Sequence, residues 1–124
     1  MTRRSLAAAA VALGVIALGG CGSSGGTAYV PPKGPPVKTI AVTGTSYKFT
    51  PSKITAPAGI LEFKLTSTDI QHSLRIKNVD GFQIEAGAGK TATGKVKLAA
   101  GTYTFYCDIP GHESAGMEGT LTVT

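Results

Sequence analysis

Tryptophan is absent from this sequence of 124 residues, and cysteine, histidine and methionine occur only twice each. Two cysteines are too few for the dense set of disulfides that stabilises small scaffold proteins. Charged residues make up 15% of the chain and hydrophobic residues 42%, which excludes a wholly disordered chain. Two histidines are also too few for most sites that hold several metal ions. The length allows a single domain.

No hydrophobic run is long enough to cross a membrane. The longest, residues 6–18, falls short of the roughly 20 residues that a transmembrane helix needs. It follows Arg3 and Arg4, an arrangement typical of a secretory signal peptide. Residues 18–21, Leu-Gly-Gly-Cys, resemble the lipobox of bacterial lipoproteins, so we predict a lipoprotein signal peptide over 1–20 and a lipidated Cys21. The alternative is an ordinary signal peptide with an incidental cysteine, and the paired arginines are also compatible with twin-arginine export.

Residues 22–36 are dominated by glycine, serine and proline and show no hydrophobic periodicity. We therefore predict that residues 21–36 form a lipidated tether and that residues 37–124 form the folded domain. Without residues 1–20, the chain has 10 cations and 7 anions, a net charge of +3. No dense basic run is present, so nucleic acid is not an expected partner.

From residue 37 onward, hydrophobic and polar residues alternate in short segments separated by glycine and proline. Leu61, Phe63 and Leu65, for example, alternate with Glu62 and Lys64. This pattern predicts strands over 38–42, 53–56, 60–66, 73–77, 91–98, 102–107 and 120–123. Seven short strands without an amphipathic helix indicate an all-β antiparallel sandwich.

The predicted domain holds one cysteine, two histidines and one methionine, and three of these four fall within eleven residues. Cys107, His112 and Met117 have the spacing Cys-x4-His-x4-Met, and His72 lies 35 residues before the cysteine. Two imidazoles, a thiolate and a weak thioether make up the ligand set of a type 1 copper centre. Taken singly, these residues are more typical of a buried core thiol, a hydrogen-bonded histidine and a core methionine, but together they make up one complete ligand set. Zinc would accept the two histidines and the cysteine, but methionine is a poor zinc ligand.

Residues 101–112 and 116–119 resemble the C-terminal ligand loop and flanking strands of the cupredoxins, and residues 57–66 with His72 resemble their first-ligand region. The resemblance covers about residues 37–124. It implies a Greek-key β-sandwich with one type 1 copper ion bound by His72, Cys107, His112 and Met117. It departs from the family at Ser73. Many cupredoxins carry an asparagine at this position, which does not bind the metal but forms hydrogen bonds that brace the ligand loop. A serine hydroxyl can still form local hydrogen bonds but reaches less far.

The resemblance implies a monomeric one-electron carrier that exchanges electrons with a redox protein such as a cytochrome or an oxidase. With the predicted lipid anchor, the protein would be attached to the cell membrane and face the periplasm or the extracellular side. We do not expect an enzyme, because no histidines remain for further coppers and no nucleophile–base pair is evident. Copper storage, delivery or resistance is the alternative, and a metal-free structural sandwich is another. Residues 98–124 carry a charge of −3, so a mildly acidic rim is expected around His112.

Overall fold

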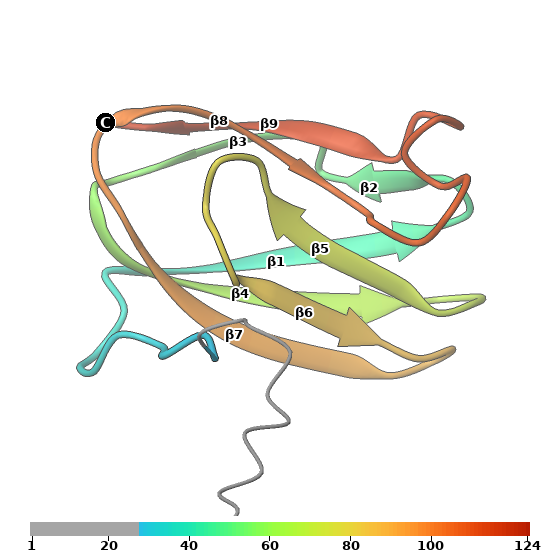
Figure 1. Cartoon of the computed structure of the whole chain (residues 1–124), viewed down its shortest axis with the longest axis horizontal. Helices are drawn as coiled ribbons and strands as arrows, with labels where there is room; N and C mark the ends of the chain where they lie inside the picture. Colours follow the sequence, from blue (N-terminus) through green and yellow to red (C-terminus); the bar gives the residue numbers. More distant parts are fainter. Residues whose placement is uncertain (1–27) are drawn as a thin grey trace, which may run out of the picture.

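The computed structural model describes residues 28–124, which fold into two packed β-sheets (Figure 1). The predicted signal peptide, Cys21 and the first part of the predicted tether lie outside the described residues. Within residues 28–124, no helix is long and hydrophobic enough to span a bilayer. The all-β prediction is confirmed for the described part of the chain.

The strands are β1 (Lys38–Thr45), β2 (Lys48–Thr50), β3 (Lys53–Ala56), β4 (Gly59–Ser67), β5 (His72–Ile76), β6 (Gln83–Ala86), β7 (Thr91–Leu98), β8 (Gly101–Tyr106) and β9 (Glu118–Val123). Strands β2 and β6 were not predicted from the sequence. They contain three and four residues respectively, too few to show a clear alternation.

One sheet has the strand order β2-β1-β4-β7 and the other β3-β9-β8-β5-β6. Most neighbours are antiparallel, but β1 pairs with β4 in parallel and β3 pairs with β9 in parallel. The predicted β-sandwich is confirmed, but the expectation that it is antiparallel is wrong for these two pairs of strands. The chain changes sheets between β2 and β3 and returns between β3 and β4, so β1 and β4 enter their common sheet from the same end.

The core lies between the sheets and is built from the inward positions of the alternating strands. In β4, Leu61, Phe63 and Leu65 are all fully buried, as the alternation predicted. Phe105 of β8 is also fully buried and packs against Phe49 of β2 with ring centroids 5.3 Å apart. Burial of these apolar surfaces is the main stabilising contribution to such a domain.

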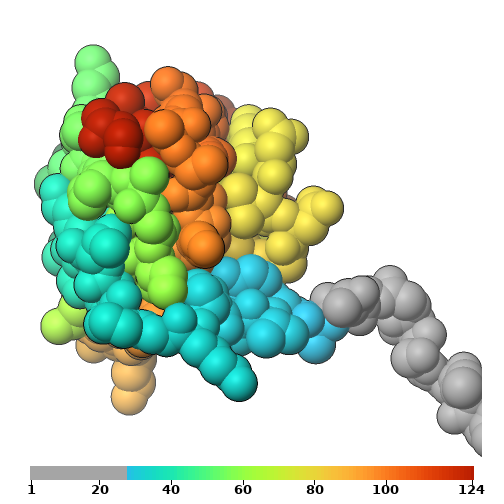
Figure 2. Space-filling view, turned by 90° about the vertical axis from the view of Figure 1, so that its left-hand side faces the viewer, coloured from blue at the N-terminus to red at the C-terminus, as the bar shows by residue number. Residues whose placement is uncertain are grey.

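The described end of the predicted tether, from residue 28, lies against the sandwich rather than apart from it. The Tyr29 hydroxyl donates a hydrogen bond to the Lys95 carbonyl at 2.7 Å, and its ring packs edge-on against Phe82 at 5.7 Å. The Lys95 ammonium in turn donates to the Gly34 carbonyl at 3.0 Å. This segment contacts the left-hand end of the molecule in Figure 1, and Figure 2, which views that end, shows it in blue against the domain.

Candidate metal centre

The four predicted ligands are positioned by one end of the five-stranded sheet. His72 is the first residue of β5, and Cys107 directly follows the last residue of β8. His112 and Met117 lie in the connection between β8 and β9. Because β5 and β8 are antiparallel neighbours, the start of β5 and the end of β8 meet at the same end, on the right in Figure 1.

The structure brings two imidazoles and one thiol together in the interior. One ligand atom each from His72, Cys107 and His112 lies within 4.8 Å of the others, a grouping that could hold a metal ion. Cys107 Sγ is 3.4 Å from His112 Nδ1, and the two imidazole ring centroids are 5.3 Å apart. His72 and Cys107 are fully buried, and His112 is 8% exposed.

Met117 is fully buried, and backbone hydrogen bonds attach it to the other loop residues. The Cys107 amide donates to the Met117 carbonyl, and the Met117 amide donates to the His112 carbonyl, both at 3.1 Å. These bonds close the loop on itself, so the thiol, the imidazole and the thioether are supplied by a single constrained segment.

The two ring nitrogens of His72 have different surroundings. Nε2 lies 2.8 Å from Asp69 Oδ1, whereas Nδ1 is buried and has no hydrogen-bond partner. A carboxylate at Nε2 favours the tautomer with the proton on Nε2, which leaves the Nδ1 lone pair available. A buried nitrogen without a partner is costly unless something binds it, so Nδ1 has the character of a metal ligand.

Asp69 is itself held in place by the turn between β1 and β2. Its Oδ2 accepts hydrogen bonds from the Ser46 hydroxyl at 2.6 Å and from the Ser46 amide at 2.8 Å. These bonds and the one to His72 stabilise the carboxylate, so they lower the pKa of Asp69 well below its ordinary value. Asp69 therefore remains an anion that accepts the His72 proton.

Two further residues shape the space around the imidazoles. A side chain at Gly44 would begin 3.1 Å from Cδ2 of His72, so the glycine leaves room for the ring. Tyr47 packs edge-on against the His112 ring with centroids 4.9 Å apart and is 46% exposed. The sequence analysis did not identify Gly44, Tyr47 or Asp69. The only indication of these residues in the sequence was that Asp69 lies three residues before the predicted ligand His72.

Ser73 reaches the ligand loop even though its side chain is short. Its hydroxyl oxygen accepts the Asp108 amide hydrogen at 2.9 Å, and its own amide donates to Cys107 Sγ at 3.4 Å. The brace between β5 and the loop is therefore present, because residue 108 comes close enough for a serine to span the gap.

The acidic residues of the ligand loop are largely paired with cations. Asp108 Oδ2 accepts from Arg75 Nη1 at 3.1 Å, and Glu113 Oε1 accepts from Lys77 Nζ at 2.7 Å. The Glu113 hydrogen bond raises the pKa of Lys77. Two of the three acidic residues on which the expected acidic rim rested are thus paired with cations, and Glu118 forms no ion pair among the described residues.

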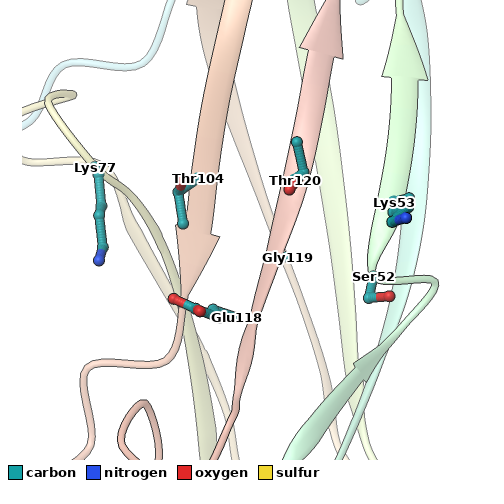
Figure 3. Close-up of a pocket in the computed structure, with 7 residues that line it drawn as sticks. All are labelled: Ser52, Lys53, Lys77, Thr104, Glu118, Gly119 and Thr120. Carbon is teal, nitrogen blue, oxygen red and sulfur yellow. The ribbon is translucent and has the colours of Figure 1, made fainter.

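A hollow of about 320 Å³ lies elsewhere, on the outer surface of β8 and β9 (Figure 3). Its lining is polar and consists of Ser52, Lys53, Lys77, Thr104, Glu118, Gly119 and Thr120. It contains no histidine or cysteine, and its one carboxylate is accompanied by two ammonium groups. The hollow therefore lacks the side chains with which the histidine–cysteine cluster could bind a metal ion.

The cluster fits a single copper ion better than other metals. A buried thiolate suits Cu(I), two imidazoles also accept Cu(II), and a thioether is acceptable only as a weak axial ligand. Structural zinc sites have four strong ligands, and only three are present among the described residues at the cluster.

Comparisons with known proteins point in the same direction. The model of the cupredoxin-like domain family matches residues 14–123. No curated protein sequence is significantly similar to this chain. Among solved structures, auracyanin B has a TM-score of 0.66 at 22% identity, covering 76% of this chain and 94% of its own.

Two further auracyanins have a TM-score of 0.58. The one from the photosynthetic bacterium Roseiflexus castenholzii, reduced with Na-dithionite, is 25% identical and is covered over 96% of its length and 69% of this chain. Auracyanin A, a "blue" copper protein from Chloroflexus aurantiacus, is 21% identical and is covered over 98% of its length and 69% of this chain. The family match spans most of the sequence, and the fold and the buried donor cluster agree with it. The chain belongs to the cupredoxin-like domain family.

Proposed function

We propose that this protein is a one-electron carrier whose type 1 copper ion is bound by His72, Cys107, His112 and Met117. The observation that supports this most strongly is the buried cluster of two imidazoles and a thiol, in which His72 Nδ1 has no partner of its own. Copper, when bound, supplies the Cu(II)/Cu(I) couple. The similarity to auracyanin A, a "blue" copper protein, agrees with this assignment.

The protein contributes rigidity and insulation around the couple. His72 is fixed by Asp69, and Cys107 is anchored between a core strand and the Ser73 amide. Because ligands on packed strands cannot rearrange freely, the same geometry would serve both oxidation states with little reorganisation. Full burial of His72 and Cys107 excludes water from two sides of the cluster.

Electrons would enter and leave through the side of the cluster that lies nearest the surface. His112 is the one ligand with measurable exposure, and Tyr47 lies against it. Tyr47 and Ile70, 46% and 41% exposed, are large apolar residues at this end. A redox protein partner such as a cytochrome or an oxidase would dock here through a small, weak interface.

Copper delivery is a less favourable reading, because a delivery site must open to pass its ion to other ligands. Here three of the four proposed ligands are fully buried. A metal-free structural role is also less favourable, because it would leave His72 Nδ1 buried without a partner. The same burial of the site leaves little room for a substrate, so we do not propose an enzyme.

The optical spectrum of the purified protein loaded with Cu(II) tests the copper assignment. We expect an intense blue band, because it arises from charge transfer between the Cys107 sulfur and Cu(II). Cys107→Ser should abolish the band while the apo fold survives by circular dichroism. A strongly blue Cys107→Ser protein, or a colourless wild type with copper bound, would contradict the proposal.

Export and anchoring complete the proposed function. Cys21 would carry the lipid, and acyl chains contribute about 0.8 kcal/mol of membrane affinity for each buried CH₂ group. Residues 28–36 contact the end of the sandwich opposite the cluster, so an anchored domain would present the cluster away from the membrane (Figure 1). We expect the protein made in a bacterial host to fractionate with membranes, and the Cys21→Ala variant not to. Mass spectrometry showing an unmodified Cys21 in the mature protein would refute the anchor.

A further inference from the structure

The Ser73 hydroxyl lies between two acceptors that compete for its single hydrogen. Its oxygen is 2.5 Å from Asp108 Oδ1 and 3.5 Å from Cys107 Sγ. The nearer acceptor is a carboxylate, and hydrogen bonds to ionised oxygens are shorter and stronger than those to sulfur. The hydroxyl hydrogen therefore goes to Asp108. The amide of Ser73, 3.4 Å from the sulfur, is then the backbone donor that remains for Cys107.

Asp108 is held in this position by two donors on neighbouring strands. Arg75 Nη1 of β5 and Gln83 Nε2 of β6 donate to Asp108 Oδ2 at 3.1 and 3.2 Å. Arg75 and Gln83 are directly paired across the two strands, so the sheet register presents both to one carboxylate oxygen. The other oxygen, Oδ1, faces Ser73, and Gln83 Nε2 lies farther from it, at 3.4 Å.

We propose that Asp108, positioned by Arg75 and Gln83, withholds the Ser73 hydroxyl from the Cys107 sulfur and thereby keeps the reduction potential of the copper site lower than this ligand set would otherwise have. A hydrogen bond to the sulfur stabilises the thiolate charge, which is larger when copper is Cu(I). A withheld hydrogen bond therefore disfavours the reduced state. Asp108 is a positioning residue in this scheme, and the inference rests on the copper site of the proposed function.

Replacing Asp108 by asparagine should reverse the direction of the Ser73 hydrogen bond. The asparagine carbonyl oxygen would face the two donors Arg75 and Gln83, so its NH₂ group would face Ser73. An NH₂ group can only donate, hence the Ser73 oxygen would accept from it and the hydroxyl hydrogen would turn to the sulfur.

The test is a double-mutant cycle on the reduction potential, with Ser73→Ala introduced into the wild type and into Asp108→Asn. In the wild type, Ser73→Ala should change the Cu(II)/Cu(I) equilibrium less than about threefold, because the sulfur loses no donor. In Asp108→Asn, the same change should shift it about tenfold toward Cu(II), which is a fall of about 59 mV for one electron. The energy of the sulfur-to-copper charge-transfer band should change together with the potential only when Ser73→Ala is introduced into Asp108→Asn.

Glu113→Gln is the matched control, because it removes a carboxylate next to a ligand without touching Ser73. In this background Ser73→Ala should behave as in the wild type. A tenfold effect of Ser73→Ala in the wild type would show that the hydroxyl already binds the sulfur and would overturn the proposal. Equal effects in the wild type and in Asp108→Asn would overturn it as well.

A second arm needs no copper. Urea unfolding of the four apo proteins of the cycle should give a coupling between Ser73 and Asp108 of about fivefold in the unfolding equilibrium constant, because the charge-assisted hydrogen bond of the wild type is stronger than the neutral bond that asparagine donates in its place. Absence of coupling would overturn the proposal. A protein that shows this coupling but forms no blue copper site would contradict the proposed function instead, so the two failures are distinguishable.

Discussion

His72 owes its chemistry to neighbours that lie on other segments of the chain. Gly44 of β1 leaves room for the ring, and Asp69 accepts the proton of Nε2. Ser46 in turn holds Asp69 through its hydroxyl and its amide. A single imidazole is thus oriented by a turn and a loop that the sequence separates by more than twenty residues. At the residue scale, the site is as much the product of these supports as of the ligands.

Asp69→Asn tests this support directly. Each carboxylate oxygen of Asp69 accepts from two donors: Ile70 N–H and His72 Nε2 on one oxygen, and the amide and hydroxyl of Ser46 on the other. An asparagine can keep its carbonyl oxygen toward Ile70 and His72, but its NH₂ group then meets the Ser46 amide, which can only donate. The negative charge opposite Nε2 is lost in either orientation, so the preference of His72 for a free Nδ1 weakens. We expect copper affinity to fall by about 10–100-fold.

Competition with a copper chelator measures this affinity. Asp80→Asn, an exposed aspartate in the turn between β5 and β6, is the matched control and should bind copper as the wild type does. Unchanged affinity in Asp69→Asn would show that packing alone orients His72.

At the scale of elements, β8 and β9 are the two strands that flank the ligand loop and hold its ends. Their close approach depends on Gly119, which pairs with Phe105 in the antiparallel ladder. A Cβ atom at Gly119 would lie 2.2 Å from Cζ of Phe105 and 2.6 Å from the Ser52 carbonyl oxygen. The Phe105 ring is fully buried, so it has little space to retreat.

Gly119→Ala should therefore destabilise the domain by about 1–3 kcal/mol, the usual cost of overpacking a core. Because β9 directly follows Met117, the copper spectrum should shift as well. Urea unfolding of the apo protein and the spectrum of the copper form measure the two effects. Gly87→Ala is the control, since a Cβ there meets only Lys90 Cγ at 3.7 Å. Equal stabilities of the two variants would contradict the steric argument.

At the scale of the whole molecule, the two ends of the sandwich have different tasks. One end holds the donor cluster and the surface around His112, and the other receives residues 28–36 (Figure 1). With the proposed anchor at Cys21, this separation would allow the protein to meet a partner without interference from the membrane. It also means that surface changes at the two ends should have different consequences for electron exchange.

Ala115→Arg places a bulky charge on the exposed part of the ligand loop, beside His112. We expect slower electron self-exchange, because such encounters use small interfaces in which one charge at the centre matters. Copper retention against a Cu(I) chelator should remain unchanged. Self-exchange is measured by NMR line broadening in mixtures of oxidised and reduced protein.

Ala100→Arg provides the comparison, since Ala100 is exposed in the turn between β7 and β8, at the opposite end. It should exchange electrons as the wild type does. Equal slowing by both variants would indicate a general charge effect, and rapid loss of copper from the reduced wild type would favour the delivery role.

The sequence by itself determined the all-β class, most of the strands and the stock of candidate ligands. Alternation in β4 predicted which side chains are buried, because residues on a strand face opposite sides in turn. The spacing of Cys107, His112 and Met117 restricted them to one loop, because a short segment after a strand end must stay close to it. These inferences depend on neighbours along the chain, and that is the information a sequence carries directly.

Only the tertiary structure decided the sheet order, the parallel pairs and the supports of the site. Strands β1 and β4 became parallel because the chain changes sheets between them, which no local pattern records. Asp69, Tyr47 and Gly44 are ordinary turn and strand residues until folding brings them to the imidazoles. Likewise, Asp108 counted only as an acidic residue until the register of β5 and β6 presented Arg75 and Gln83 to it. Contacts between distant segments follow from how whole strands pack, so they cannot be obtained from residue types alone.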